Sequence, residues 1–261
     1  MNELLIIKLS MDEVLFLGTG GGRYTALFQE RSTGGIVLKI DKHQIHLDPG
    51  PGALLRCKDC GVFPFSTDCL MASHHHLDHV NDLAMMIEGM TRATKKKRGM
   101  LITTKSVIDH TLNNYHKELV EKIVTLTPEQ NTALDGIRIK AIKCVHSAED
   151  SIGFKFYTNN YCLYYTGDTY IYPGFENNLK DVDYLIANNL FPENNSMNYH
   201  MCTNDLISAL KNSTNKIKLI ILTHFDISML RASPENEAKI VTAKTGINCV
   251  AAKDSMVVAL K

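Results

Sequence analysis

The stretch Ser73-His74-His75-His76-Leu77-Asp78-His79 concentrates side chains that can bind metal ions. Its candidate ligands are His74, His76, Asp78 and His79. Alternation along an extended backbone turns His74 and His76 to one side and His75 to the other. One metal ion could take the two alternate histidines, and a second could take the Asp78-His79 pair. Imidazole and carboxylate suit zinc, and they also suit iron or manganese. A histidine-rich loop or tag is the alternative, but the run is internal and is interrupted by Leu and Asp.

The flanking segments indicate how these side chains are positioned. Cys69-Leu70-Met71-Ala72 predicts a buried strand before the stretch, and residues 80–92 predict a helix after it. The candidate ligands therefore lie on a strand-to-helix turn, where binding and catalytic groups collect on a rigid scaffold.

Three more candidates follow predicted strands. His146 follows the strand over 137–144, and His224 ends the apolar strand over 217–223. Asp168 ends a predicted hairpin with strands at 152–156 and 161–165. An isolated histidine is more often a hydrogen-bonded polar residue than a ligand, whereas an aspartate at a strand end can offer its two oxygens to two metal ions.

These motifs, in this order, resemble the metallo-β-lactamase superfamily. The signature Ser-His-x-His-x-Asp-His is followed by His146, Thr166-Gly167-Asp168-Thr169 and Leu222-Thr223-His224-Phe225. The resemblance implies an α/β fold, a four-layer αββα sandwich of two mixed sheets with helices outside. It assigns His74, His76 and His146 to one metal ion. It assigns Asp78, His79 and His224 to the other, with Asp168 bridging. True β-lactamases carry Cys in place of Asp168, and flavo-diiron relatives carry Glu in place of His76, so neither antibiotic hydrolysis nor O₂ chemistry is expected.

Within the superfamily the chain resembles the tRNase Z-like phosphodiesterases. Leu15-Phe16-Leu17-Gly18-Thr19-Gly20-Gly21 resembles their opening, and His200-Met201-Cys202-Thr203 resembles their His-Ser-Thr motif ahead of a helix over 204–212. Two features differ. Ala187-Asn188-Asn189-Leu190 stands where the family has His-Glu-Ala-Thr. Asp168 lies only 22 positions after His146, which leaves room for a hairpin but not for a tRNA-binding arm. The resemblance therefore implies phosphodiester chemistry without tRNA 3′-end processing.

The implied activity is that of a dinuclear metal-dependent hydrolase, most simply a phosphodiesterase that uses a hydroxide shared by two divalent ions. Zn²⁺ is the expected metal, with Mn²⁺ or Fe²⁺ as alternatives. Asp78 would bind a metal ion and accept a proton from the attacking water, and His200 would contact the phosphoryl oxygen or protonate the leaving group. The expected substrate is a small phosphodiester, a nucleotide or a nucleic-acid end. The alternatives are hydrolysis of another ester or thioester, and a non-catalytic RNA-binding or metal-binding module.

Composition sets broader limits. The chain has 261 residues, formal charge +0 and seven cysteines, an odd number that favours reduced thiols over a disulfide framework. Zero net charge disfavours a long, nonspecific nucleic-acid footprint.

No apolar run approaches the roughly 20 residues of a membrane span, and the N-terminus is a poor secretion signal, so we expect a cytoplasmic protein. No linker is visible, which predicts one domain over 1–261. A homodimer is expected only by analogy.

Four smaller features leave alternatives open. Gly18–Gly22 predicts a tight turn or a segment that lines the site, and Asp48 predicts either a residue that orients a ligand histidine or a helix cap. Cys57 and Cys60 are either half of a second zinc site or two thiols one helical turn apart. The basic run Arg92–Arg98 is either a solvated loop or a contact for substrate phosphates. Residues 1–10 are expected to add an edge strand.

Overall fold

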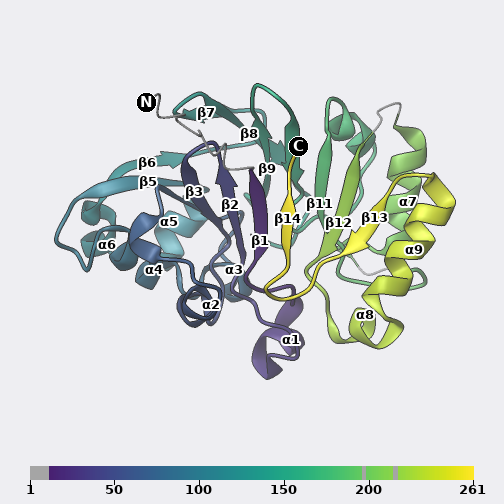
Figure 1. Ribbon diagram of the computed structural model, residues 1–261, viewed down its shortest axis with the longest axis horizontal. Helices are drawn as coiled ribbons and strands as arrows, with labels where there is room; N and C mark the ends of the chain where they lie inside the picture. Colours follow the sequence, from purple (N-terminus) through teal and green to yellow (C-terminus); the bar gives the residue numbers. More distant parts are fainter. Residues whose placement is uncertain (1–11, 196–197, 214–216) are drawn as a thin grey trace, which may run out of the picture.

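The protein is a sandwich of two seven-stranded sheets (Figure 1). The structure, a computed structural model, describes residues 12–195, 198–213 and 217–261. The edge strand expected over 1–10 lies outside these residues. The first sheet has the order β14-β1-β2-β3-β4-β5-β6, and the second has the order β13-β12-β11-β10-β9-β8-β7.

The strands of the first sheet are β1 (Glu13–Phe16), β2 (Ile36–Ile40), β3 (His43–Leu47), β4 (Cys69–Met71), β5 (Arg98–Thr103), β6 (Val120–Thr125) and β14 (Val257–Ala259). Those of the second are β7 (Asn131–Leu134), β8 (Ile137–Lys143), β9 (Ile152–Tyr157), β10 (Cys162–Tyr165), β11 (Tyr184–Asn188), β12 (Leu219–Thr223) and β13 (Cys249–Ala251). Both sheets are mixed, because β3 to β6 and β10 to β13 pair in parallel while the remaining pairs are antiparallel.

Helices cover the outer face of each sheet. Beside the first sheet lie α2 (Ala53–Asp59), α3 (Leu77–Val80), α4 (Leu83–Met90), α5 (Lys105–Thr111) and α6 (Asn114–Leu119); beside the second lie α7 (Thr203–Asn212), α8 (Ile227–Ala232) and α9 (Pro234–Thr245). Two short 3₁₀ helices are η1 (Pro64–Ser66) and η2 (Phe175–Leu179). Helix α1 (Gly22–Phe28) projects from the end of the sandwich (Figure 1).

Side-chain alternation produces the layers. Val14 and Phe16 of β1 belong to the core between the sheets, whereas Leu15 packs with the helices outside the first sheet. A third apolar cluster joins the second sheet to α7, α8 and α9. The layers therefore follow the predicted αββα order.

Several predicted elements have different bounds. The helix expected over 80–92 is divided into α3 and α4, with Asp82 at the N-terminus of α4. Residues 105–119 likewise form two helices, because α5 ends at Thr111 and the Asn113 side chain caps the start of α6 by accepting from the His116 N–H. Helix α1 was not predicted, since Gly18–Gly22 was interpreted only as a turn or site-lining segment.

Candidate dinuclear metal site

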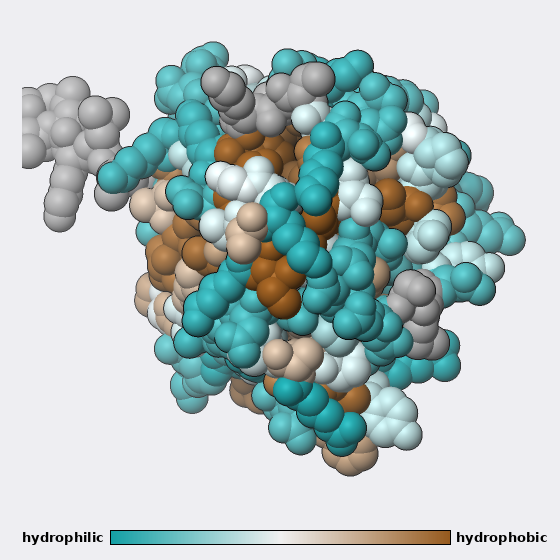
Figure 2. All heavy atoms as spheres, turned by 90° about the vertical axis from the view of Figure 1, so that its right-hand side faces the viewer, coloured by the Kyte–Doolittle hydropathy of each residue, from teal (hydrophilic) through white to brown (hydrophobic). Residues whose placement is uncertain are grey.

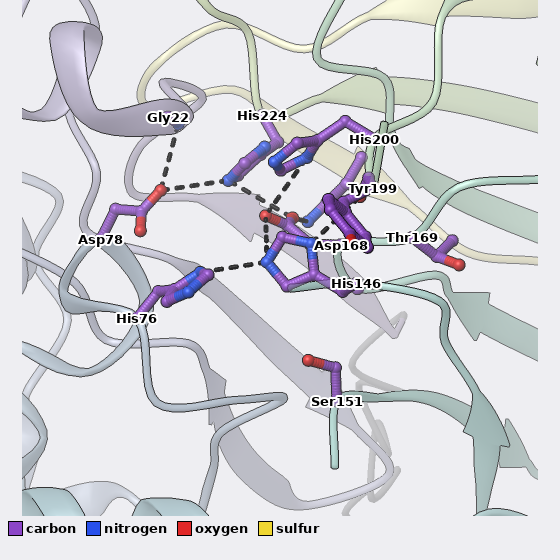
Figure 3. Close-up of polar contacts among 12 residues, drawn as sticks. Gly22, His76, Asp78, His146, Ser151, Asp168, Thr169, Tyr199, His200 and His224 are labelled. Carbon is purple, nitrogen blue, oxygen red and sulfur yellow. Dashed lines mark hydrogen bonds and ion pairs between the residues drawn. The ribbon is translucent and has the colours of Figure 1, made fainter. Parts of the chain in front are cut away.

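The candidate site lies at one edge of the sandwich, where strands of both sheets end. The turn after β4 carries His74, His76, Asp78 and His79. The segments after β8, β10 and β12 carry His146, Asp168 and His224. Strands β8, β10, β11 and β12 run in the same direction, so their carboxyl ends meet at this edge. The fold therefore brings together ligands that are far apart in the sequence (Figure 3).

The inner nitrogens of His74, His76 and His146, which form the first histidine group, converge on one point. His76 Nδ1 lies 3.0 Å from His74 Nε2 and 3.0 Å from His146 Nε2. These ligand atoms are all close enough to share an ion. Two nitrogens that bind one tetrahedral zinc lie about 3.3 Å apart when each Zn–N bond is about 2.0–2.1 Å, so the three imidazoles fit a divalent ion.

The second group adjoins the first. His79 Nε2 lies 3.0 Å from His224 Nε2, and Asp78 Oδ2 lies 3.5 Å from the same His224 nitrogen. Asp168 lies between the groups: its Oδ2 is 3.4 Å from His79 Nε2 and 3.9 Å from His146 Nε2. One carboxylate thus contacts both histidine groups, which is the position a bridging ligand requires.

The imidazole rings of His74, His79 and His146 are oriented by hydrogen bonds at Nδ1, the nitrogen that faces away from the candidate metal positions. His79 Nδ1 donates to Asp48 Oδ2 at 2.9 Å, and His146 Nδ1 donates to the Tyr199 carbonyl at 3.0 Å. Ser73 Oγ donates to Asp48, so its oxygen is free to accept from His74 Nδ1 at 3.0 Å. When the imidazole is neutral, each of these bonds makes Nε2 the unprotonated nitrogen and turns it inward, which is how proteins prepare histidines to bind metals. The donor set and its orientation therefore fit two divalent ions.

Asp48 orients ligands, as one of the two sequence interpretations expected. It is 4% exposed and accepts hydrogen bonds from Ser73, His79 and Tyr165, the last at 2.6 Å. The helix-cap alternative is wrong, because Asp48 caps no helix among the described residues.

The sequence did not predict the roles of Asn188 and Tyr165. Asn188 Nδ2 donates to Asp168 Oδ1 at 2.7 Å and to the Tyr165 hydroxyl oxygen at 3.1 Å. Tyr165 in turn donates to Asp48, so a buried chain of hydrogen bonds connects Asp168 to the partner of His79. The available signal was that Asn188 occupies the place of the glutamate in the family's His-Glu-Ala-Thr run.

The charges in the site depend on one another. Burial raises the pKa of Asp168, but His224 and His79 outweigh it and hold that pKa well below its usual range. Burial lowers the pKa of His79, but Asp168, Asp78 and Asp48 raise it well above its usual value. Burial lowers the pKa of His76 to about 4 and that of His74 well below its usual value. His74 and His76 are thus neutral, as metal binding requires, and the carboxylates of Asp78 and Asp48 lie beside His79.

His200 borders the site, and with His146 and Asp168 it forms a further candidate metal group. Its Nδ1 lies 3.6 Å from Asp168 Oδ2, and its side chain is 22% exposed. The His200 ring packs edge-on against Phe191 and against His146 (Figure 3). Burial lowers the pKa of His200 to about 4 although Asp168 acts in the opposite direction. A neutral imidazole with one nitrogen near the site and an open side can donate a hydrogen bond to a ligand.

The glycine-rich segment lines the site. The Gly22 N–H donates to Asp78 Oδ2 at 3.1 Å, and a Cβ on Gly21 would lie 2.3 Å from His224 Nδ1. His224 itself has a left-handed backbone, with φ 62°, which is uncommon for a residue other than glycine and often marks a functional position. Gly20 and Phe225 form a parallel bridge that joins the two sheets beside the site.

Two other sequence features lie away from this edge. The basic run Arg92–Arg98 precedes β5, and β5 runs parallel to β4, so the run lies at the opposite end of these strands from the histidine turn. Cys57 and Cys60 belong to none of the candidate metal groups found among the described residues. Cys60 Sγ lies 3.4 Å from Ser255 Oγ instead.

Comparisons with known proteins identify the family. A profile of the Beta-lactamase superfamily domain matches residues 43–225. The protein MJ1374 of Methanocaldococcus jannaschii is 32% identical over 247 residues, which cover 92% of each chain. A ribonuclease Z of Pyrococcus furiosus is 35% identical over 80 residues, or 31% of this chain and 25% of the relative.

Solved structures share the whole fold. YhfI, a metallo-β-lactamase fold protein of Bacillus subtilis, has a TM-score of 0.79 at 17% identity and covers 95% of this chain and 99% of its own. The short form of human tRNase Z has a TM-score of 0.73 at 16% identity, with coverage of 95% and 99%. The chain therefore belongs to the metallo-β-lactamase superfamily of metal-dependent hydrolases, and both the predicted family and the αββα fold are confirmed.

Proposed function

We propose that the protein is a dinuclear metal-dependent phosphodiesterase. The observation that carries this proposal is the position of His200 beside Asp168, at 3.6 Å and on the open side of two facing ligand groups. His74, His76 and His146 would hold one divalent ion, Asp78, His79 and His224 the other, and Asp168 both. Zn²⁺ suits this donor set, with Mn²⁺ or Fe²⁺ as alternatives.

The metal ions, Asp78 and His200 would each have a separate role in hydrolysis. Two bound divalent ions would lower the pKa of a shared water toward 7 and stabilise negative charge on the attacking and leaving oxygens. Asp78 lies at the rim and accepts from the Gly22 N–H, so it can also accept a proton from an attacking water. His200 donates a hydrogen bond to a phosphoryl oxygen, where charge increases in the transition state.

The fold favours a small phosphodiester substrate over a whole tRNA. The segment between His146 and Asp168 forms the hairpin of β9 and β10 and contains no additional arm. The preferred substrate is a small phosphodiester, a nucleotide or a nucleic-acid end. Among the described residues no helix is both long and apolar enough to cross a membrane. A cytoplasmic location, a homodimer and a single domain over 1–261 remain predictions.

The test is a comparison of substrates on zinc-loaded protein. We expect turnover of bis-p-nitrophenyl phosphate and none of a glutathione thioester, because a phosphodiester develops charge on several oxygens that this site can contact. Turnover of the thioester alone would show that the metal site serves another ester, and binding of RNA without turnover of either would show a non-catalytic module.

His200→Ala tests the assigned contact. Loss of one preorganised donor lowers kcat by about 100- to 1,000-fold, while the metal content should stay at the wild-type value because the seven assigned ligands are all retained. A loss of zinc in His200→Ala would instead assign His200 to a metal ion, in the group that it forms with His146 and Asp168. His116→Ala on α6, which replaces a partly exposed histidine outside the site, should leave kcat unchanged. An unchanged kcat in His200→Ala would remove the residue from the mechanism.

A further inference from the structure

Helix α1 presents an unusual exposed face beside the metal site. Tyr24, Leu27 and Phe28 are 69%, 80% and 69% exposed. They lie at positions i, i+3 and i+4, so they share one face of the helix. The rings of Tyr24 and Phe28 are stacked, with centroids 6.0 Å apart and planes at 23°. Figure 2 shows hydrophobic atoms among hydrophilic ones at the end of the molecule from which α1 projects in Figure 1.

The start of α1 is fixed to the site. Its first residue, Gly22, donates its N–H to Asp78 Oδ2 at 3.1 Å, and α1 packs on α3, which carries Asp78 (Figure 3). With a rise of about 1.5 Å per residue, Phe28 lies only about 9 Å along the helix axis from Gly22, so the aromatic face begins close to the site. A substrate whose scissile phosphate lies at the metal site would therefore pass along this face.

The face also carries a positive charge. Arg23 follows Gly22 directly, is exposed, and forms no ion pair among the described residues. Arginine pairs with phosphate through a planar fork of N–H donors. A stacked aromatic pair next to an unpaired arginine matches the way proteins bind single-stranded nucleic acid, through base stacking combined with backbone charge.

We propose that α1 binds the nucleotides adjacent to the scissile phosphate, with Tyr24 and Phe28 stacking on bases and Arg23 contacting a backbone phosphate. This deepens the proposed function, on which it rests, by naming single-stranded nucleic acid as the substrate class. A second copy of the chain is a weaker occupant. Stable dimers bury about 800 Å² on each partner, which is far more than the exposed face of a seven-residue helix provides.

A tryptophan reporter tests the contact without requiring turnover. The chain contains no Trp, so Tyr24→Trp places a single indole on the proposed face. We expect an oligoadenylate of about eight nucleotides, with phosphorothioate linkages that slow hydrolysis, to quench this indole saturably. Phe65→Trp is the matched control, because Phe65 is 50% exposed on η1, ahead of β4 and opposite the metal turn. It should not be quenched.

Two further variants define the contact. Adding Phe28→Ala to Tyr24→Trp should weaken binding by about 5- to 150-fold, the loss of one stacked base. Adding Arg23→Ala should reduce the slope of log affinity against log salt by about one. Oligonucleotide affinity, and not turnover of bis-p-nitrophenyl phosphate, is the readout for both variants.

Three results would overturn the proposal: absent quenching at position 24, equal quenching at positions 24 and 65, or a dimer that dissociates in Phe28→Ala with oligonucleotide affinity unchanged. The proposed function fails separately, when wild-type protein does not turn over bis-p-nitrophenyl phosphate whatever the indole reports.

Discussion

At the scale of single residues, the site depends on side chains that contact ligands as well as on the ligands themselves. Asn188 is the clearest case, since its amide donates to Asp168 and to Tyr165 while its backbone N–H donates to Thr166 Oγ1. At the position that corresponds to the glutamate of the His-Glu-Ala-Thr run, this chain has an amide that donates to Asp168, the proposed bridging ligand. Asn188 is thus a positioning residue for Asp168.

Asn188→Ala should weaken zinc binding by about 10- to 100-fold, because Asp168 loses the donor that fixes its Oδ1. Zinc affinity measured by competition with a chromophoric chelator reports the change. Asn189→Ala is the matched control, since the Asn189 amide donates to Thr203 and to the Phe191 carbonyl and not to a ligand. Equal losses of zinc affinity in the two variants would remove the special role of Asn188.

The residue scale also shows what the sequence can predict. His74, His76, Asp78 and His79 lie within six residues of one another. Their spacing on a strand-to-helix turn is therefore enough to predict that they bind metal ions. The contacts of Asn188 could not be predicted in this way. They depend on the parallel register that pairs Tyr165 with Ile186, two residues before Asn188, and no local pattern encodes that register.

At the scale of elements, the glycine-rich segment and α1 form one wall of the site. The prediction that the segment lines the site was one of two alternatives, and the structure supports it through Gly21 and Gly22. Helix α1 could not be predicted from Gly22–Phe28, because it is short, has no side-chain cap and leaves its apolar residues exposed rather than buried. Periodicity identifies helices by a buried face, which α1 lacks.

Gly21→Ala should disrupt the second ion position. The new methyl group would lie 2.3 Å from His224 Nδ1, so the imidazole must shift away from His79 and Asp78. We expect the purified variant to retain about one zinc ion where the wild type retains two. Gly61→Ala places a methyl group with no neighbour within 4 Å but at a φ of 67°, which strains the backbone, so it shows whether backbone strain away from the site alone changes the zinc content. Unchanged zinc content in Gly21→Ala would show that His224 is not confined by the glycine segment.

At the scale of the whole molecule, the sandwich holds both sheets in a fixed register, so that the ends of β3, β4, β8, β10 and β12 meet at one edge. The motif order predicted this arrangement because relatives use the same fold. Strand β11, which carries Asn188, was not predicted as a strand.

The free energy of unfolding should decrease in acid because of the buried His46 side chain. The ring is fully buried in β3, where Nε2 donates to the Gly34 carbonyl at 2.8 Å, and burial lowers the pKa of His46 to about 4. The unfolded chain therefore binds more protons between about pH 6.5 and 4. This contribution is fully present above about pH 6.5 and is lost as the pH falls toward 4, by roughly 3 kcal/mol.

Urea unfolding at several pH values measures this effect. His46→Gln, which keeps a donor near Gly34 but does not titrate, should lose less stability than the wild type between pH 6.5 and 4. His110→Gln, at an exposed position on α5, should follow the wild type. Parallel stability curves for wild type and His46→Gln would contradict the assignment.

The most direct test of the whole account is anomalous scattering at the zinc edge from crystals of zinc-loaded protein. The account predicts two peaks, one among His74, His76 and His146 and the other among Asp78, His79 and His224, with Asp168 contacting both. A single peak, or peaks away from this edge of the sandwich, would contradict it.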